Sequence, residues 1–250
     1  MRDIGAASTA AERIGAISHL MHVRNIGVLA VQETKIRSAE PTPGVFGLSY
    51  HGTSACMQTG HRTGGTGFLV REDAEPFFTY LGILPHKRRV APTKFAATWA
   101  RVYGSTPADD IYIGSVYLPC DRNSRSADTV YTSALQDLGA DVEQLAARTG
   151  RTILAGDFNA RVGSKTTKSM PAHLRMTAPA YGEPTLDTHG KHLLRFCVDH
   201  NLKFVSCTTH AHPTCIGHGR TNTGTGTSII DHILWARSHS PLQPPRVVSH

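Results

Sequence analysis

The chain has 250 residues, of which 40% are hydrophobic and 18% charged, a balance that excludes wholesale disorder. Its 26 basic residues outnumber its 19 acidic residues, so its formal net charge of +7 favours a polyanionic partner such as nucleic acid. The five cysteines form no CxxC pair, which makes a disulfide framework or a zinc ribbon unexpected. No apolar run is long enough to span a membrane, and no secretory signal is evident, so we expect a nuclear or cytoplasmic protein.

The first half of the chain predicts one helix followed by several strands. Apolar residues at helical spacing indicate an amphipathic helix over about residues 9–22, and the apolar run 28–31 indicates a buried strand. Residues 41–67 are rich in Gly, Thr, Ser and Pro and indicate a loop with a short strand at 45–50. Further strands are expected at 67–70, 77–84, 95–103 and 111–118, as successive antiparallel neighbours in one sheet.

The second half alternates helices and strands. A helix is predicted over 130–148, then a buried strand at 152–155 that Gly156 stops. An exposed loop at 165–183 precedes a helix at 190–200 and a strand at 202–207. A mobile loop is expected at 215–227 and a last strand at 228–235. This order predicts a layered α/β protein, and the lack of repeats or linkers predicts one domain over 1–250 with a core of about 9–237.

The polar end of the 152–155 strand is the strongest candidate for a site. Asp157 and Asn159 follow the apolar run with Phe158 between them. On extended backbone, residues two apart project the same way, so we expect the carboxylate and the carboxamide to point out together. Such a pair suits hydrolysis of a phosphate ester, because a carboxylate binds a hard cation or accepts a proton from water. The alternative is an Asp/Asn turn that merely closes a strand.

The string Gly156-Asp157-Phe158-Asn159-Ala160 resembles the GDFNA motif of the endonuclease/exonuclease/phosphatase superfamily. The residues that follow, Arg161-Val162-Gly163, are similar to its retrotransposon branch, the LINE-type, apurinic-endonuclease-like endonucleases. The resemblance implies a DNase I-like, four-layer α/β fold: a sandwich of two mixed, mainly antiparallel sheets flanked by helices.

Three further motifs follow the family's order, each at the end of an expected strand. Gln32-Glu33-Thr34 resembles a QET motif whose Glu binds the metal, although a polar cluster ending a strand is the plain alternative. Tyr117-Leu118-Pro119 resembles a Y-x-P motif whose Tyr contacts the phosphate, although Tyr before Pro is common. Ser228-Ile229-Ile230-Asp231 resembles an S-x-I-D motif whose Asp orients a catalytic His. An acid inside an apolar strand is costly unless partnered, which favours a functional Asp231.

The resemblance also implies roles for individual residues. Glu33 would hold Mg²⁺, with Mn²⁺ as an alternative, Asp157 would activate water, and Asn159 would position that water or the phosphate. Tyr117 would donate to a phosphate oxygen and Asp231 would align a histidine. The basic residues expected to contact substrate are Lys35 and Arg161, with Arg122 as a further backbone contact.

Departures from the family pattern matter as well. The family's opening strand carries an Asn, and residues 1–8 contain none. The family closes on an Asp-His pair, whereas this chain ends in Ser249-His250. A retrotransposon-type N-x-x-G-x-x-L-x-x-F pattern has Asp187 in place of its Asn, with Gly190 and Phe196 retained. We therefore expect a domain that is incomplete at its first and last strands.

The sequence thus predicts Mg²⁺-dependent hydrolysis of phosphodiesters in DNA by a retrotransposon-type endonuclease. The alternatives are an inactive remnant that still binds nucleic acid through its charge, or a phosphatase of the same superfamily. The partner expected is DNA, with no membrane, and fusion to or association with a reverse transcriptase would fit the retrotransposon branch. No oligomeric state follows from the sequence.

Overall fold

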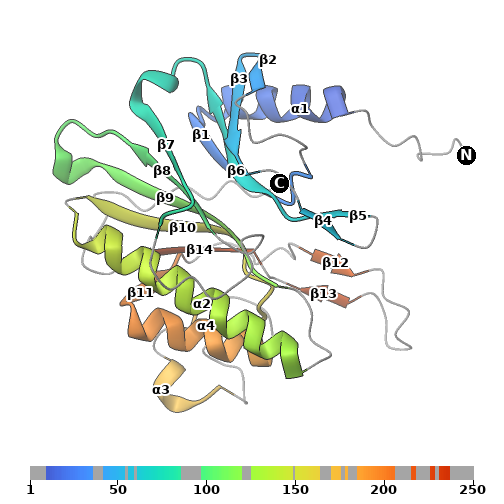
Figure 1. The fold of residues 1–250 in the computed structure, drawn as a ribbon, viewed down its shortest axis with the longest axis vertical. Helices are drawn as coiled ribbons and strands as arrows, with labels where there is room; N and C mark the ends of the chain where they lie inside the picture. The colour runs from blue at the N-terminus through green and yellow to red at the C-terminus, as the bar shows by residue number, and fades with distance from the viewer. Residues whose placement is uncertain are drawn as a thin grey trace, which may run out of the picture.

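The computed structural model describes residues 10–35, 42–53, 56–58, 61–85, 97–119, 125–148, 150–163, 170–175, 178–179, 185–205, 215–217, 226–228 and 231–236 (Figure 1). Its helices are α1 (Ala10–Val23), α2 (Arg125–Ala146), α3 (Ala172–Arg175) and α4 (Thr188–Asp199). Short 3₁₀ turns occur at Glu75–Phe77 and Pro107–Asp109. The helices expected over 9–22, 130–148 and 190–200 are therefore confirmed as α1, α2 and α4.

The larger sheet has six strands in the order β11-β14-β10-β9-β8-β7. Their bounds are β7 (Phe78–Gly82), β8 (Thr98–Val102), β9 (Ile111–Tyr117), β10 (Arg151–Asp157), β11 (Leu202–Phe204) and β14 (Asp231–Ala236). Strands β9 and β10 are parallel, and the other pairs are antiparallel. A crossover through α2 joins the parallel pair, as parallel strands require.

The smaller sheet has four antiparallel strands in the order β1-β6-β3-β2. They are β1 (Val28–Gln32), β2 (Thr42–Val45), β3 (Leu48–Gly52) and β6 (Thr66–Arg71). Two separate two-stranded ladders pair β4 (Cys56–Gln58) with β5 (His61–Thr63) and β12 (Cys215–Gly217) with β13 (Gly226–Ser228).

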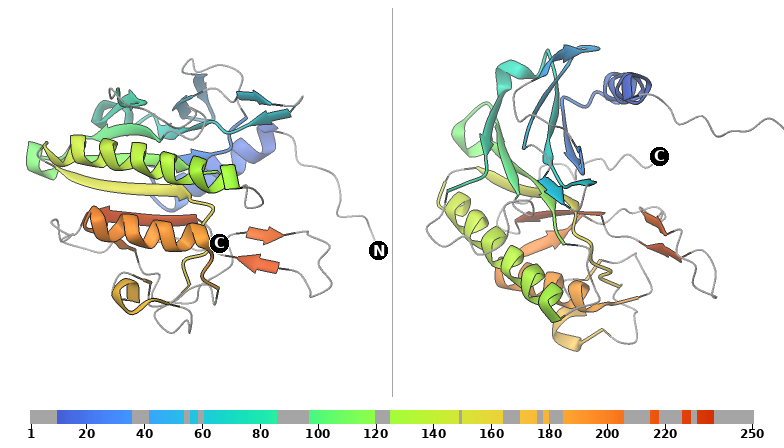
Figure 2. Two further views of the ribbon diagram at one scale, coloured as in Figure 1. Left: turned by 60° about the horizontal axis from the view of Figure 1, so that its bottom comes forward. Right: turned by 45° about the vertical axis from the view of Figure 1, so that its right-hand side comes forward.

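The elements stack in four layers, with α1 beside the smaller sheet and α2 and α4 on the far side of the larger one (Figures 1 and 2). The main core fills the space between the larger sheet and these helices, around Trp99, Leu154 and Leu193. A smaller core lies between the sheets, around Phe68 and Phe78. The predicted class, two mainly antiparallel sheets flanked by helices, is confirmed. No helix in the described ranges has the length and apolar character needed to cross a membrane.

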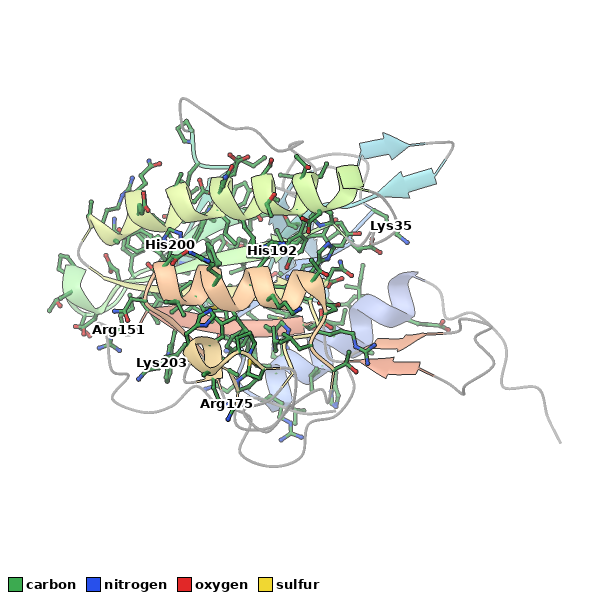
Figure 3. The ribbon with its side chains drawn as sticks, turned by 90° about the horizontal axis from the view of Figure 1, so that it is seen from below. Lys35, Arg151, Arg175, His192, His200 and Lys203 are labelled. Atoms are coloured by element: carbon green, nitrogen blue, oxygen red, sulfur yellow. The ribbon has the colours of Figure 1, made fainter. Side chains whose placement is uncertain are left out.

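Helices α2 and α4 lie side by side, and two histidines stand between them, His192 within α4 and His200 directly after it (Figure 3). His192 Nε2 lies 3.1 Å from a carboxylate oxygen of Asp128, and His200 Nδ1 lies 3.6 Å from one of Glu143. Gly139 leaves room for His200, because a methyl group there would come within 2.6 Å of its Nε2. These contacts fix α4 on α2, and α4 in turn abuts the loop after β10.

Some expectations about the strands were wrong. The single strand predicted at 45–50 is instead a hairpin, because Phe46 and Gly47 both have positive φ, as a two-residue type I′ turn requires. The strands predicted at 67–70 and 77–84 belong to different sheets, as β6 and β7. The loop predicted at 215–227 contains paired strands at both ends, β12 and β13.

Two strand predictions near the site also need correction. Gly156 does not stop β10: it continues the strand with φ +153°, and a side chain there would overlap the carbonyl oxygen of Val116. Strand β1 is apolar as predicted but is only half-buried along its whole length. Among the described strands it pairs only with β6, so it is an edge strand of the smaller sheet.

Candidate active site

Three polar residues form a row across neighbouring strands at one end of the larger sheet. Asp157, the last residue of β10, is paired with Tyr117 of β9 on one side and with Asp231 of β14 on the other. Residues paired directly across strands project from the same face of a sheet. The pairing therefore brings two carboxylates and a phenol, separated by 40 or more positions in the chain, to one sheet end.

Glu33 completes this row from the other sheet. The Tyr117 hydroxyl donates a hydrogen bond of 2.6 Å to Glu33 Oε1, and the Lys35 ammonium lies 3.8 Å from Glu33 Oε2. Tyr117 is buried, whereas the Glu33 and Lys35 side chains are 43% and 58% exposed. Lys35 lies near the outer end of this group, far from Arg151 at the opposite end of β10 (Figure 3). Glu33 is therefore anchored on one oxygen and open to solvent on its other side.

The polypeptide around Glu33 is held in an unusual backbone conformation. Glu33 and Lys35 have φ values of +50° and +54°, in the left-handed region that side chains other than glycine rarely occupy. Backbone bonds from Thr34 and Lys35 to the carbonyls of Gly65 and Gly64 hold the segment in place. The Tyr50 hydroxyl lies 3.3 Å from Thr34 Oγ1. Such strained residues are often found at functional sites.

Gln32 links the two sheets directly beneath this group. Its Nε2 atom donates to Ser115 Oγ at 2.9 Å and to the carbonyl of Ala155 at 3.4 Å. Ser115 Oγ in turn donates to the carbonyl of Val31 at 3.0 Å, and Ser115 is fully buried. We assigned no role to Gln32 from the sequence. Its contacts fix the end of β1 against β9 and β10, and so fix Glu33 against Tyr117 and Asp157.

The carboxyl group of Asp157 is electrostatically unusual. Burial raises its pKa to about 6, and the negative charges of Asp231 and Glu33 act in the same direction. A hydrogen bond of 2.9 Å from the Asn159 N–H opposes the rise. Asp157 is therefore ionised at neutral pH but a stronger base than an exposed aspartate, the property that a proton acceptor in catalysis needs.

Asn159 is close to Asp157, but not in the way expected. Its φ of +48° shows that the backbone turns after Asp157 rather than continuing extended. Its carboxamide is buried and donates to the carbonyl of Leu118 at 2.9 Å. The expected outward projection of the carboxamide is therefore wrong, because the turn directs it inward, but the Asn159 side chain still lies close enough to Asp157 to lower the pKa of its carboxyl group. The backbone N–H of Asn159 also bonds to the Asp157 carboxylate, the local turn that Asp readily forms.

The remaining predicted residues have different positions. Asp231 begins β14 and is exposed, so the expectation that it lies inside an apolar strand is wrong. Arg161 follows Asn159 in the loop; its N–H donates to Asp187 Oδ1 at 3.2 Å, and its Nε atom is buried. Arg122 and His250 fall outside the described residues, as do residues 229–230 of the S-x-I-D motif.

The pattern that begins at Asp187 holds the far end of the same loop. Asp187 caps α4, and its Oδ1 accepts hydrogen bonds from the N–H groups of Gly190 at 2.7 Å and Arg161 at 3.2 Å. A side chain at Gly190 would overlap the carbonyl oxygen of Arg161. Phe196 lies in the main core. Asp187 thus supplies the acceptor that an Asn would supply at this position, and the substitution leaves the cap intact.

A divalent cation fits this group of side chains. Within the described ranges, no three His, Cys, Asp or Glu side chains cluster closely enough to hold an ion by themselves. Mg²⁺ does not require three, because it commonly binds through one or two carboxylates together with water and substrate phosphates. Glu33 and Asp231 both lie close enough to Asp157 for their charges to raise its pKa, and this concentration of negative charge favours a cation. Glu33, with one oxygen on its exposed side, is the best-placed ligand.

Comparisons with known proteins identify the family and the fold. The model of the endonuclease/exonuclease/phosphatase family matches residues 6–249. No curated protein matches the chain significantly. Among solved structures, an AP endonuclease from Leishmania major has 14% identity and a TM-score of 0.59, covering 90% of this chain and 74% of that one.

Two further structures are similar. The APE2 catalytic domain of Xenopus laevis has 17% identity and a TM-score of 0.57, covering 91% of this chain and 79% of that one. A 3′ phosphatase from Neisseria, bound to product DNA, has 15% identity and a TM-score of 0.53, covering 91% and 82%. These likenesses show the fold, and the family match covers nearly the whole chain. The chain belongs to the endonuclease/exonuclease/phosphatase family.

Proposed function

We propose that this protein hydrolyses phosphodiester bonds in DNA with the help of Mg²⁺, as an endonuclease of the retrotransposon type. The observation that supports this best is the contact between the two sheets at the site. The Tyr117 hydroxyl binds Glu33 at 2.6 Å, and Asp157 is the immediate cross-strand neighbour of Tyr117. A candidate metal ligand and a candidate base are therefore held together at one end of the sandwich.

Asp157 is the proposed proton acceptor. With its pKa raised to about 6, it is ionised at neutral pH and can take a proton from a water molecule. The water oxygen then forms a bond to phosphorus, and the bond from phosphorus to the leaving oxygen of the strand breaks. The Asn159 N–H holds Oδ1 of the carboxylate at 2.9 Å and so fixes the orientation of the carboxyl group.

Glu33 is the proposed metal ligand, and Tyr117 orients it. A bound Mg²⁺ would neutralise charge on the phosphate and on the leaving oxygen. A phenol has one hydrogen, and here it is given to Glu33. Tyr117 can therefore donate to a phosphate oxygen, as the family resemblance implies, only after its hydrogen bond to Glu33 breaks. The geometry favours orientation of Glu33 as its resting role.

DNA is the proposed substrate for two reasons. The chain has an excess of 7 positive charges, and Lys35 is exposed beside Glu33 where a phosphate would approach. Similar folds include a protein named as an AP endonuclease and a 3′ phosphatase bound to product DNA. The retrotransposon subtype rests on the string from Gly156 to Gly163 and on the Asp187–Gly190 cap, and Arg161 within that string is a proposed substrate contact.

A labelled duplex tests the proposal and separates a nuclease from a phosphatase. One duplex carries a 5′ label and no terminal phosphate, and a second carries a 3′ phosphate. Internal cleavage with Mg²⁺ gives shorter labelled strands, whereas a phosphatase releases only inorganic phosphate from the second duplex. We expect internal cleavage, lost in Glu33→Gln and Asp157→Ala and retained in Glu72→Gln, which alters an exposed acid directly after β6. Phosphate release without strand cleavage would contradict the proposal.

A further inference from the structure

The loop after Asp157 is held by its backbone carbonyl groups. Each carbonyl from Phe158 to Arg161 accepts a hydrogen bond from a distant part of the chain. The donors are Tyr131 Oη to Phe158 O at 3.0 Å, His189 Nδ1 to Asn159 O at 3.3 Å, His232 Nε2 to Ala160 O at 2.9 Å and Asp187 N to Arg161 O at 3.0 Å. Three of these four donors are side chains, and they come from α2, α4 and β14.

The two histidine rings are restricted to one tautomer each by these contacts. A carbonyl oxygen only accepts hydrogen bonds, so His189 has its hydrogen on Nδ1 and His232 has its hydrogen on Nε2. Burial lowers the pKa of His232 to about 4, so its ring is neutral at physiological pH. Each ring therefore presents a single, permanent donor to the loop.

The donors are themselves fixed by packing. Tyr131 is fully buried, and His189 is 4% exposed. Their rings stack with centroids 3.8 Å apart and planes 7° from parallel. The His232 ring packs edge-on against Phe204. None of the three rings can rotate without opening the core, so the carbonyl acceptors are held against rigid partners.

Holding these carbonyls determines where the Asn159 N–H points. Each carbonyl belongs to a planar peptide unit, so fixing the oxygens of Phe158 and Asn159 fixes the two peptide units around Asn159. That residue has a φ of +48°, in the left-handed region that asparagine adopts more readily than most residues, and the fixed peptide units on both sides hold it there. In this conformation its N–H bonds to Asp157 Oδ1 at 2.9 Å.

We propose that Tyr131, His189 and His232 are positioning residues, which hold the Asp157 carboxylate in its working orientation through the backbone of residues 158–160. The inference deepens the proposed function and rests on it, because it assigns a role in catalysis to side chains that do not touch substrate. Side chains of α2, α4 and β14 thereby determine the geometry of the acid at the end of β10.

The Asn159 amide reports this geometry without any need for activity. Its proton chemical shift and its rate of hydrogen exchange, measured by NMR at pH 7.5, depend on its bond to Asp157. Tyr131→Phe and His189→Leu should move this resonance upfield and speed its exchange about tenfold or more, while the Trp99 amide in β8 is unchanged. His189→Asn and His232→Gln keep an N–H near the original donor position and should restore the wild-type values, in contrast to His189→Leu and His232→Leu.

Kinetics supply the second readout. A misplaced reacting group costs about 10- to 100-fold in rate, so kcat should fall by that factor while the KM for DNA stays within about twofold. Ser18→Ala is the matched control, because it removes a buried hydroxyl donor to the carbonyl of Phe46 in a region remote from the site. It should lower stability without altering the Asn159 amide or kcat.

The outcomes separate the two proposals. An Asn159 amide that is unchanged in both Tyr131→Phe and His189→Leu overturns the positioning role, whatever the activity. A displaced amide together with a wild type that cleaves no DNA refutes the proposed function but leaves the structural coupling in place. A displaced amide with unchanged kcat shows that the contacts are structural only and overturns the inference.

Discussion

The Tyr117 hydroxyl donates a hydrogen bond of 2.6 Å to Glu33, and this bond joins strands β9 and β1 of two different sheets at the proposed active site. It is supported from beneath by the contact between Gln32 and Ser115, which joins the same two strands. The spacing between the proposed metal ligand and the proposed base therefore depends on how the two sheets are fastened together. A change that loosens this junction should affect catalysis more than stability.

Tyr117→Phe tests that junction. The variant removes one hydroxyl from a buried ring, so the free energy of unfolding should fall by only about 1 kcal/mol. Loss of a group that orients a metal ligand typically costs about 10- to 100-fold in metal affinity or activity. The Mg²⁺ concentration for half-maximal cleavage should therefore rise at least tenfold. Tyr103→Phe, which alters an exposed ring, should leave it unchanged; an equal response in both variants would contradict the assignment.

Asp157→Asn should abolish cleavage and yet stabilise the fold. The folded-state pKa of Asp157 is raised from 3.8 to about 6, so ionisation opposes folding, and this cost is fully present above about pH 6. Allowing for partial solvent screening, removing the charge should add about 1–2 kcal/mol to the free energy of unfolding at pH 8. The gain should vanish below about pH 4, where the carboxyl is protonated in both states. Urea unfolding at the two pH values measures it, and a loss of stability at pH 8 would contradict the burial of this carboxylate.

His232 should make the fold sensitive to acid. The ring is neutral in the folded state down to about pH 4, whereas in the unfolded chain it is protonated below about 6.5. The unfolded state therefore takes up the proton first, and stability is lost as the pH falls from about 6.5 to 4. The loss attributable to this ring is about 3 kcal/mol. Between about pH 6.5 and 4, the free energy of unfolding measured in urea should fall by about 3 kcal/mol more for the wild type than for His232→Gln. Equal falls for the two proteins would refute the prediction.

Gly190→Ala should disturb both the fold and the site. A methyl group there overlaps the carbonyl oxygen of Arg161, so the loop or α4 must move, at a cost of about 1–3 kcal/mol. Gly15→Ala is the matched control in α1, where the new methyl meets only the Phe46 ring at 3.8 Å. It should stabilise the protein by about 0.5–1 kcal/mol through helix propensity. Thermal unfolding measures the stability of both variants. Equal stabilities would show that the loop and α4 can move apart at Gly190 without cost.

Much of the site could be predicted from local sequence patterns. Glu33, Tyr117 and Asp157 each follow an apolar run, so both the strand and the polar residue at its end can be recognised from neighbouring residues alone. Their order along the chain matches the family, which is why they could be assigned to one site. The layered α/β class followed from the alternation of strands and helices, whereas the sandwich of two sheets was implied by the family resemblance.

What could not be predicted depends on contacts between distant residues. Tyr131, His189 and His232 lie 27, 30 and 72 positions from the carbonyls they hold, and in the sequence each resembles an ordinary core residue. The inward turn of Asn159 depends on the Leu118 carbonyl, 41 positions away, directly after β9. Membership of β6 and β7 in different sheets is likewise a property of pairing between strands, which hydrophobic periodicity does not determine.

The half-burial of β1 has the same origin. Its sequence, residues 28–32, is apolar enough for a central strand, and periodicity alone therefore predicts a buried one. In the structure it pairs with β6 alone among the described strands, and an edge position exposes part of each side chain. The composition of a strand predicts that it will be buried, whereas the number of strands beside it determines what fraction of its surface is buried.

Nicking of supercoiled plasmid in the presence of Mg²⁺ tests the central claim most directly. The experiment compares three samples of folded protein with Mg²⁺: the wild type, Asp157→Ala, and the wild type with EDTA added. We expect nicked circles from the wild type with Mg²⁺, and intact plasmid from Asp157→Ala and from the wild type with EDTA. Intact plasmid from all three would contradict the proposed hydrolysis, and equal nicking by Asp157→Ala would contradict the role of Asp157 as the proton acceptor.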